Sequence, residues 1–200
     1  MTDIDRSVIE ALRRGEDRAY AAVIDALHGP VYRFLLRLCR DSGLAEDMTQ
    51  ETFLAVWQGI GSYQGRSKFK TWVFGIAYHQ HLRQRDKRTV ETVELNESDL
   101  SDLSDPSDLS VAVAEAEEHA LIRRAVYALP NPYREVVCLI HLDGLTYRDV
   151  AEVLGVPIGT VKSRMNGAFK LLREKLGECG VQDNDVRQPE GVPGRPTEIL

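Results

Sequence analysis

Residues 145–172 contain two short helical patterns joined by a tight turn, and this stretch constrains the fold more than any other. Thr146 is a good N-cap for the first helix, whose apolar residues recur at helical spacing. Gly155 is a typical helix end, and Pro157 suits the first turn of a second helix. The sequence therefore predicts a helix-turn-helix.

The second helix of this pair has one apolar face and one basic, polar face. Gly159 leaves its N-terminus slim enough to approach a phosphate or a base edge. The inward positions are Val161, Met165, Ala168, Leu171 and Leu172. The outward positions, which carry donors suited to the major groove, are Thr160, Lys162, Ser163, Arg164, Asn166 and Lys170. We predict that they bind duplex DNA; the alternative is a plain helical hairpin with a solvated basic face.

Charge is segregated along the chain, although the net charge is −6. From Arg66 to Arg88 every charged residue except Asp86 is basic, whereas residues 89–118 contain acids and no Lys or Arg. Repeated Ser-Asp-Leu and low hydrophobicity predict a flexible acidic linker over residues 89–114. We therefore expect an N-terminal domain over residues 1–88, a C-terminal domain over 115–176, and a disordered tail over 177–200.

The N-terminal domain has helical periodicity throughout, and neither domain has a β-type alternation of useful length. The expected helices span residues 7–13, 17 to the Gly29-Pro30 pair, 31–40, 44–60 and 69–85, with Ser7 as the first cap and a turn at residues 41–43. Phe69 and Trp72 are expected in the core. The fold class is thus all-α, with two small helical domains and a linker.

Several kinds of protein are disfavoured. No apolar run approaches the ~20 residues that span a bilayer, and the polar start does not resemble a signal peptide, so we expect a cytoplasmic protein without membrane insertion. Cys39, Cys138 and Cys179 lie far apart and are expected to be unpaired thiols, the first two of them buried. We find no phosphate-binding, metal-binding or nucleophile motif, so we expect no enzyme activity, no cofactor and no metal.

Two segments carry a family resemblance. Residues 44–78 read LAEDMTQETFLAVWQGIGSYQGRSKFKTWVFGIAY, and residues 129–176 read LPNPYREVVCLIHLDGLTYRDVAEVLGVPIGTVKSRMNGAFKLLREKL. The first resembles the promoter-melting and core-polymerase-binding domain of bacterial sigma factors of the extracytoplasmic-function (ECF) group. The second resembles the domain of that group that reads the minus-thirty-five element. The helix-turn-helix alone is moderately specific, but both segments in this order are highly specific.

The resemblance implies a polymerase-binding face on the helix that begins near Leu44. In the family this acidic helix docks on a coiled coil of the largest polymerase subunit, which requires carboxylates and amides on one face. The residues at these positions are Glu46, Asp47, Gln50, Glu51 and Leu54. A solvated acidic helix start, favoured by the helix dipole, is the alternative.

The resemblance also implies that residues 63–69 capture an extruded base of the minus-ten non-template strand. In this loop Gly65 lets the backbone approach, Ser67 can bond a base edge, Tyr63 offers a stacking surface, and Arg66 and Lys68 attract phosphate. The expected minus-ten residues are Tyr63, Gly65, Arg66, Ser67, Lys68 and His79.

His79 stands where the group usually has Asn, and Arg83 where it often has Asp, so the minus-ten preference and a base contact by His79 stay open. The residues 177–200 are a third departure from the family pattern.

Together these observations predict a promoter-specificity subunit that binds core RNA polymerase, reads both promoter elements and assists strand opening. Expected partners are core RNA polymerase and promoter DNA, both as duplex and as single non-template strand; an anti-sigma protein is a further candidate. The alternatives are a free-standing helix-turn-helix regulator with an N-terminal sensing or dimerisation module, and a helical interaction adaptor.

Overall fold

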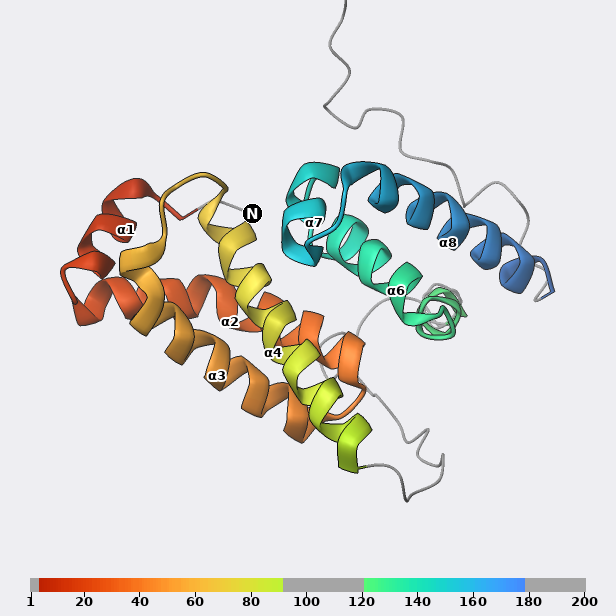
Figure 1. Ribbon diagram of the computed structural model, residues 1–200, viewed down its shortest axis with the longest axis horizontal. Helices are drawn as coiled ribbons and strands as arrows, with labels where there is room; N and C mark the ends of the chain where they lie inside the picture. Colours follow the sequence, from red (N-terminus) through yellow and green to blue (C-terminus); the bar gives the residue numbers. More distant parts are fainter. Residues whose placement is uncertain (1–3, 92–120, 179–200) are drawn as a thin grey trace, which may run out of the picture.

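The computed structural model describes residues 4–91 and 121–178, and within these ranges all regular secondary structure is helical (Figure 1). The all-α expectation is therefore confirmed. Most of the expected linker and tail lies outside the described residues. At their edges, α4 continues to Glu91 and α8 to Glu178, so both helices run past the ends expected from the sequence.

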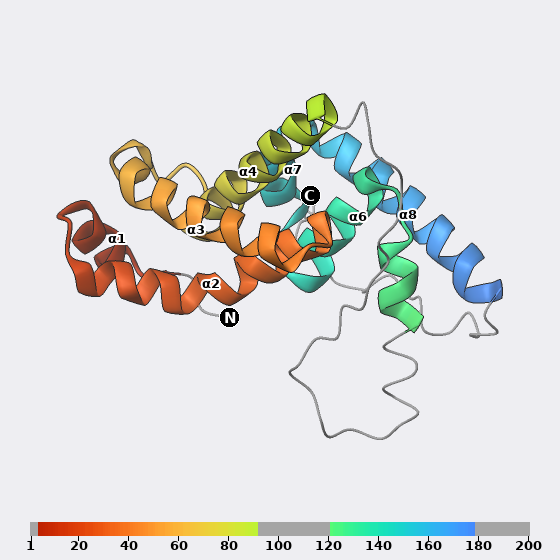
Figure 2. The same cartoon turned by 90° about the horizontal axis from the view of Figure 1, so that it is seen from below.

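The N-terminal half consists of α1 (Arg6–Arg13), α2 (Asp17–Cys39), α3 (Ser42–Gly59), the 3-10 turn η1 (Ile60–Ser62) and α4 (Phe69–Glu91). Helices α2, α3 and α4 pack on one another, and α1 contacts α2 and η1. The long axes of these three helices lie side by side in both cartoon views (Figures 1 and 2). This arrangement leaves the loop between η1 and α4 at one end of the bundle.

Helix α2 runs unbroken through Pro30, so the expected interruption at Gly29-Pro30 is wrong. Proline inside a helix removes one backbone hydrogen bond and costs about 3 kcal/mol. On either side of it, however, Val23, Leu27, Val31 and Phe34 form one buried stripe. Because burial of each such side chain contributes about 1.5–3 kcal/mol, the packing of a continuous helix outweighs the local cost.

Two helix starts also differ from the sequence expectation. The N-cap of α1 is Asp5 rather than Ser7. The expected turn at residues 41–43 instead begins α3, because the Asp41 side chain caps the helix by accepting a hydrogen bond from the Leu44 backbone N–H at 2.9 Å.

The C-terminal half contains a helical segment at residues 121–127, α6 (Asn131–Val137), a π-helical turn η2 (Cys138–Leu142), α7 (Tyr147–Leu154) and α8 (Ile158–Glu178). Helix α8 packs across α6 and α7. At the α6 crossing, a Cβ added to Gly167 would come within 2.6 Å of Tyr133 Cε1, so the close approach requires glycine.

The predicted helix-turn-helix is confirmed in its local detail. Thr146 and Asp149 form a reciprocal capping box at the start of α7. Gly155 ends the helix in the left-handed conformation with φ 63°. Pro157 is the residue directly before α8 rather than within its first turn.

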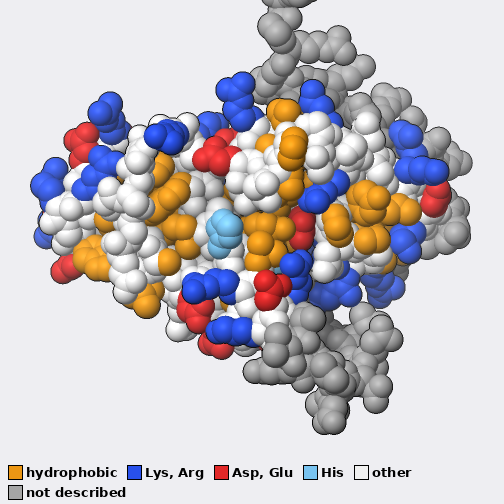
Figure 3. All heavy atoms as spheres, viewed as in Figure 1, with side chains coloured by type: hydrophobic (Ala, Val, Ile, Leu, Met, Phe, Trp, Pro, Cys, Tyr) orange, Lys and Arg blue, Asp and Glu red, His pale blue; other side chains and the backbone are white. Residues whose placement is uncertain are grey.

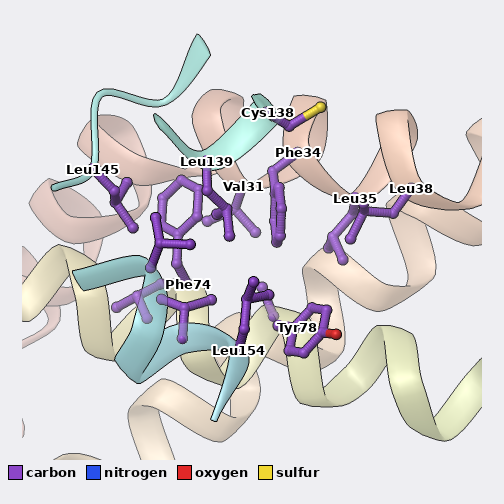
Figure 4. Close-up of a cluster of buried hydrophobic side chains, with 14 of the residues drawn as sticks. Val31, Phe34, Leu35, Leu38, Phe74, Tyr78, Cys138, Leu139, Leu145 and Leu154 are labelled. Atoms are coloured by element: carbon purple, nitrogen blue, oxygen red, sulfur yellow. The ribbon is translucent and has the colours of Figure 1, made fainter. Parts of the chain in front are cut away.

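The two halves share a hydrophobic core (Figure 4). Helix α4 packs on α7, and α2 packs on α6 and η2. Phe34 and Phe74 from the N-terminal half, and Leu139 from the C-terminal half, are completely shielded from solvent, and Leu154 is 8% exposed. The two helical domains therefore pack on each other through a shared core.

Of the two cysteines expected to be buried, Cys138 is buried and Cys39 is only half-buried. Cys138 is fully buried, and burial raises the pKa of its thiol to about 12, which keeps it protonated. Cys39 is half-buried and its thiol donates to the Asp41 carbonyl at 3.3 Å. Cys179 lies outside the described residues.

No helix in the described ranges has both the length and the apolar character needed to cross a membrane. Over the same ranges, no group of three or more His, Cys, Asp or Glu side chains is arranged to hold a metal ion.

Candidate nucleic-acid interface

Helix α8 presents the two faces that its periodicity predicts. Val161, Met165, Ala168 and Leu172 are buried against the rest of the domain. The exposed side chains on the other face are Lys162, Ser163, Asn166 and Lys170, and Thr160 is half-buried. Four of the six expected DNA-reading residues are thus fully accessible on one helix.

Ile158 is a surface residue that sequence reasoning missed. It is the first residue of α8 and is 44% exposed, one of four large apolar side chains exposed among the described residues. Spacing of four residues places it in line with Lys162 and Asn166. An apolar side chain at the start of α8 is suited to contact a thymine methyl group. Its four-residue spacing from Lys162 is the sequence signal that could have placed Ile158 on the same face.

Arg164 differs from its neighbours because a buried acid holds it. Its side chain is only 26% exposed, and its Nη1 lies 3.9 Å from Glu135 Oε2 on α6. The Tyr78 hydroxyl of α4 donates to the same carboxylate oxygen at 3.2 Å. Burial raises the pKa of Glu135, and the Tyr78 hydrogen bond and Arg164 both oppose that effect. Arg164 therefore belongs partly to the contact between the two halves.

In the loop at residues 63–69, Tyr63 is not the open stacking surface that we expected. Its ring is 8% exposed and packs on Phe69 and Trp72, with centroids 5.3 and 5.2 Å away. The Tyr63 hydroxyl donates to the Ser67 carbonyl at 2.7 Å, and the Arg13 side chain donates to the Tyr63 carbonyl. Burial of the aromatic ring and these two hydrogen bonds fix the conformation of the loop. Tyr63 therefore supports the loop from its buried side.

Residues 64–66 and Lys68 of the loop are exposed. Gly65 adopts φ 70° with no atom within 4 Å of an added Cβ, so glycine is needed there for backbone conformation and not for space. Arg66 and Lys68 are exposed, and Ser67 is half-buried. The loop thus has two accessible cations around a fixed turn, which is suitable for holding a phosphate backbone.

His79 is exposed on α4, ten residues after Phe69 and so about 15 Å along the helix from the loop. It does not share a site with residues 63–69, although it can extend the same surface. His81 is different: it is only 7% exposed. Burial first, and then the nearby Arg85 and Arg134, lower the pKa of His81 to about 4.

The exposed face of α3 carries the other expected site. Asp47, Gln50, Glu51 and Leu54 are exposed, whereas Glu46 is half-buried. Gln50 donates to Glu46 at 3.4 Å, and His28 Nε2 lies 3.9 Å from the same carboxylate. Leu54 is 55% exposed, so a large apolar side chain stands beside acids. This combination suits a protein partner with a basic, partly apolar surface.

The face of the molecule shown in Figure 3 does not carry a single uniform charge. On the face shown in Figure 3, Lys and Arg side chains are spread over both halves, with acidic and hydrophobic side chains between them. The net charge of the chain therefore does not indicate where on this face a partner would bind.

Comparison with known proteins defines the class. Sigma-70 region 2 matches residues 23–89, and Sigma-70, region 4 matches residues 119–172. These two regions, in this order, define a sigma factor of the sigma-70 family, the subunit that binds core RNA polymerase and directs it to promoters. Since region 2 accounts for the N-terminal half, the free-standing regulator is not favoured.

Relatives narrow the assignment further. The ECF RNA polymerase sigma factor SigK of Mycobacterium sp. (strain KMS) is 33% identical over 178 residues, covering 88% of this chain and 92% of that protein. RNA polymerase sigma-H factor of Pseudomonas aeruginosa is 30% identical over 180 residues, covering 86% and 93%. The chain belongs to the ECF subfamily of sigma-70 sigma factors.

Solved structures show the same architecture. The sigma factor RpoE, crystallised with the anti-sigma factor NepR from Bartonella quintana, matches with a TM-score of 0.61 and 25% identity, over 79% of this chain and 96% of that one. CnrH, in complex with the cytosolic domain of CnrY, matches in fold with a TM-score of 0.62 and 23% identity, over 88% and 99%.

Proposed function

We propose that three surfaces of this sigma factor bind three different partners during transcription initiation. Helix α8 reads the minus-thirty-five duplex, residues 63–69 hold the minus-ten single strand, and α3 binds core polymerase. The observation that carries this proposal is the loop at residues 63–69, where a buried tyrosine fixes a turn whose cations face solvent. The protein acts by binding, in the cytoplasm where transcription occurs, without catalysis, cofactor or metal.

On α8, the exposed polar side chains are well suited to base edges and phosphates of the major groove. Lys162, Asn166 and Ile158 lie along one line of the helix and are the candidates for base readout. Thr160, Ser163 and Lys170 flank that line and suit phosphate contacts. Arg164 contributes to the interface once its guanidinium leaves Glu135.

In the minus-ten loop, a base read on its pairing edge must first leave the stack, at a cost of a few kcal/mol. Arg66 and Lys68 attract the strand, Ser67 supplies hydrogen-bonding groups, and Gly65 permits close approach of the backbone. His79 extends this track along α4. Core polymerase positions both halves on one promoter and thereby supplies the free energy of strand separation.

On α3, the carboxylates and amides of Glu46, Asp47, Gln50 and Glu51 face a basic surface of core polymerase, with Leu54 as the apolar contact. An anti-sigma protein is a further partner, since the related RpoE and CnrH were each solved in complex with a partner protein, in the case of RpoE an anti-sigma factor. Such a protein would compete with polymerase for this sigma factor.

The test is permanganate footprinting of promoter DNA with core polymerase and the Ser67→Ala/Lys68→Ala variant. We expect normal core binding and closed-complex formation but impaired strand opening, with partial rescue on a premelted template. The matched control is Gln64→Ala, an exposed neighbour in the same loop. Normal strand opening by the double variant would refute the role of these two residues.

A further inference from the structure

The minus-ten loop, residues 63–69, is attached at its first residue to a helix that lies outside the region 2 match. Helix α1 ends before residue 23, where that match begins, and it contacts α2 and η1. In Figure 1, α1 and the loop lie at the same end of the bundle. The side chain of Arg13, in the last turn of α1, donates to the Tyr63 backbone carbonyl. This hydrogen bond joins residues that are fifty positions apart in the chain.

Two apolar residues of α1 set the position of Arg13. Ile9 and Leu12 are buried, with exposed fractions of 9% and 1%. After the helix, Gly15 adopts a left-handed φ of 77°, which glycine does at little cost, and the chain turns into α2. Because Leu12 is buried directly before it, the backbone of Arg13 is fixed. The guanidinium therefore reaches the loop at a lower cost in conformational entropy than it would from a frayed helix end.

Each polar group of Tyr63 has a hydrogen-bond partner, and Arg13 supplies one of them. The Tyr63 N–H donates to the Ile60 carbonyl at 3.2 Å, and the hydroxyl donates to the Ser67 carbonyl at 2.7 Å. The Tyr63 carbonyl accepts from Arg13. The first two bonds are local, whereas the third attaches the loop to a separate helix. Without Arg13 the loop would keep its internal bonds but lose this attachment to α1.

The Tyr63 carbonyl belongs to the peptide plane that leads into the exposed part of the loop. Gln64, Gly65 and Arg66 follow it and are exposed, and Gly65 adopts a φ of 70°. Since the peptide unit is planar, rotation of the Tyr63 carbonyl would also redirect the Gln64 N–H and the backbone that follows. A loop that receives an unstacked base binds better when these groups are already in place, because ordering them during binding costs affinity.

The two adjacent arginines at the end of α1 differ in what their side chains contact. Arg13 donates to the loop, whereas Arg14 Nε donates to Glu16 Oε1 at 2.7 Å, two residues away. Both arginines are exposed. A hydrogen bond from a charged donor is about twice as strong as one between neutral groups, so a guanidinium restrains a carbonyl better than a neutral side chain would.

We propose that Arg13 is a positioning residue for strand opening: it holds the Tyr63 carbonyl and thereby keeps the minus-ten loop in the conformation that receives the single strand. The inference rests on the proposed function of residues 63–69. It adds α1 to the parts of the chain that open the promoter, although α1 lies outside the region 2 match. Arg13 acts through Tyr63 and needs no contact with DNA.

The first measurement is hydrogen–deuterium exchange of the free, full-length chain, which reports whether the loop loosens. Arg13→Ala is compared with Arg14→Ala, which removes the same side chain and charge from the neighbouring position, and with Arg13→Lys, which keeps a charged donor. We expect Arg13→Ala to speed exchange of the amides of residues 63–69 about fivefold, because loss of one hydrogen bond shifts the local opening equilibrium. Arg14→Ala should match wild type, and Arg13→Lys should restore part of the protection.

The second measurement uses core polymerase and promoter DNA. Affinity in the closed complex should be the same for Arg13→Ala and wild type. The rate of strand opening, followed by permanganate reactivity over time, should fall about fivefold, since a smaller fraction of loops is competent to receive the strand. Arg13→Lys should recover part of this rate. A general loss of folding would instead lower the affinity and the opening rate together, and Arg13→Lys would not separate them.

The inference is overturned if the loop of Arg13→Ala exchanges at the wild-type rate, whatever the DNA assay shows. It is also overturned if the loop loosens but strand opening keeps its wild-type rate, or if Arg14→Ala is equally defective. Failure of the proposed loop function is read separately, as normal strand opening by Ser67→Ala/Lys68→Ala. A defect in that double variant together with unchanged loop exchange in Arg13→Ala would retain the role of the loop and reject the role of Arg13.

Discussion

Acid should destabilise this protein through His81. The side chain is 7% exposed at the contact between α4 and the C-terminal half, beside Tyr78, Arg85 and Arg134. Burial is the main reason that its pKa falls from 6.5 to about 4 in the folded chain, and the two arginines lower it further. Between these values the unfolded chain binds more protons, so the free energy of unfolding decreases as the pH is lowered through this window.

The magnitude follows from the two pKa values. At pH 5 most unfolded chains carry a proton on His81 whereas most folded chains do not. With about 1.36 kcal/mol for each pKa unit, the loss relative to pH 8 is about 2 kcal/mol, as an order of magnitude. His81→Gln removes the titrating group and should remove this part of the pH dependence.

The assay is urea unfolding of wild type and His81→Gln at pH 8, 7, 6 and 5. The difference between the two curves is the quantity of interest, because burial raises the pKa of Asp143 to about 6 and this acid contributes with the opposite sign. His79→Gln, which removes an exposed imidazole from the same helix, is the control and should follow wild type. Parallel pH profiles for wild type and His81→Gln would refute the reasoning.

Three other predictions follow from the geometry. Lys162→Ala should weaken binding to the minus-thirty-five element by ~1–3 kcal/mol if a base contact is lost, with core binding unchanged in a polymerase pull-down; unchanged promoter occupancy would remove this residue from the groove. Thr146→Ala deletes the side-chain cap of α7 and should lower the free energy of unfolding by about 0.5–2 kcal/mol in urea titration. A change in that free energy near zero would mean that the capping box does not stabilise the fold. Protease cleavage between residues 92 and 120 should leave two fragments that co-elute in gel filtration because they share a core, and elution as separate species would contradict the packed interface.

Local signals predicted the helix-turn-helix well because they are encoded in neighbouring residues. Thr146 and Asp149 form a cap within four residues, and Gly155 ends the helix by its own backbone freedom. The two faces of α8 likewise follow from periodicity alone. Such features depend on residues close together in the chain, so they can be predicted without knowledge of long-range packing.

The sequence was less informative wherever distant segments determine the outcome. Pro30 predicts a break only until the buried stripe on both sides of it is considered. Tyr63 could not be distinguished from an open stacking residue, because no periodicity shows that its ring packs on Phe69 and Trp72 or that its carbonyl accepts from Arg13, fifty positions earlier in the chain. The pairing of Thr71 with Asp149 joins residues that no periodicity relates.

The core shared by the two halves has a consequence for how such chains can recombine. Phe74 on one side and Leu139 and Leu154 on the other are shaped for each other, as are the charges around them. A chimera that takes its C-terminal half from a relative would inherit that relative's promoter element but not a matching inner surface. Exchange of the helix-turn-helix alone should therefore change two properties together: the DNA contacts of α8, and the packing of the two halves on each other.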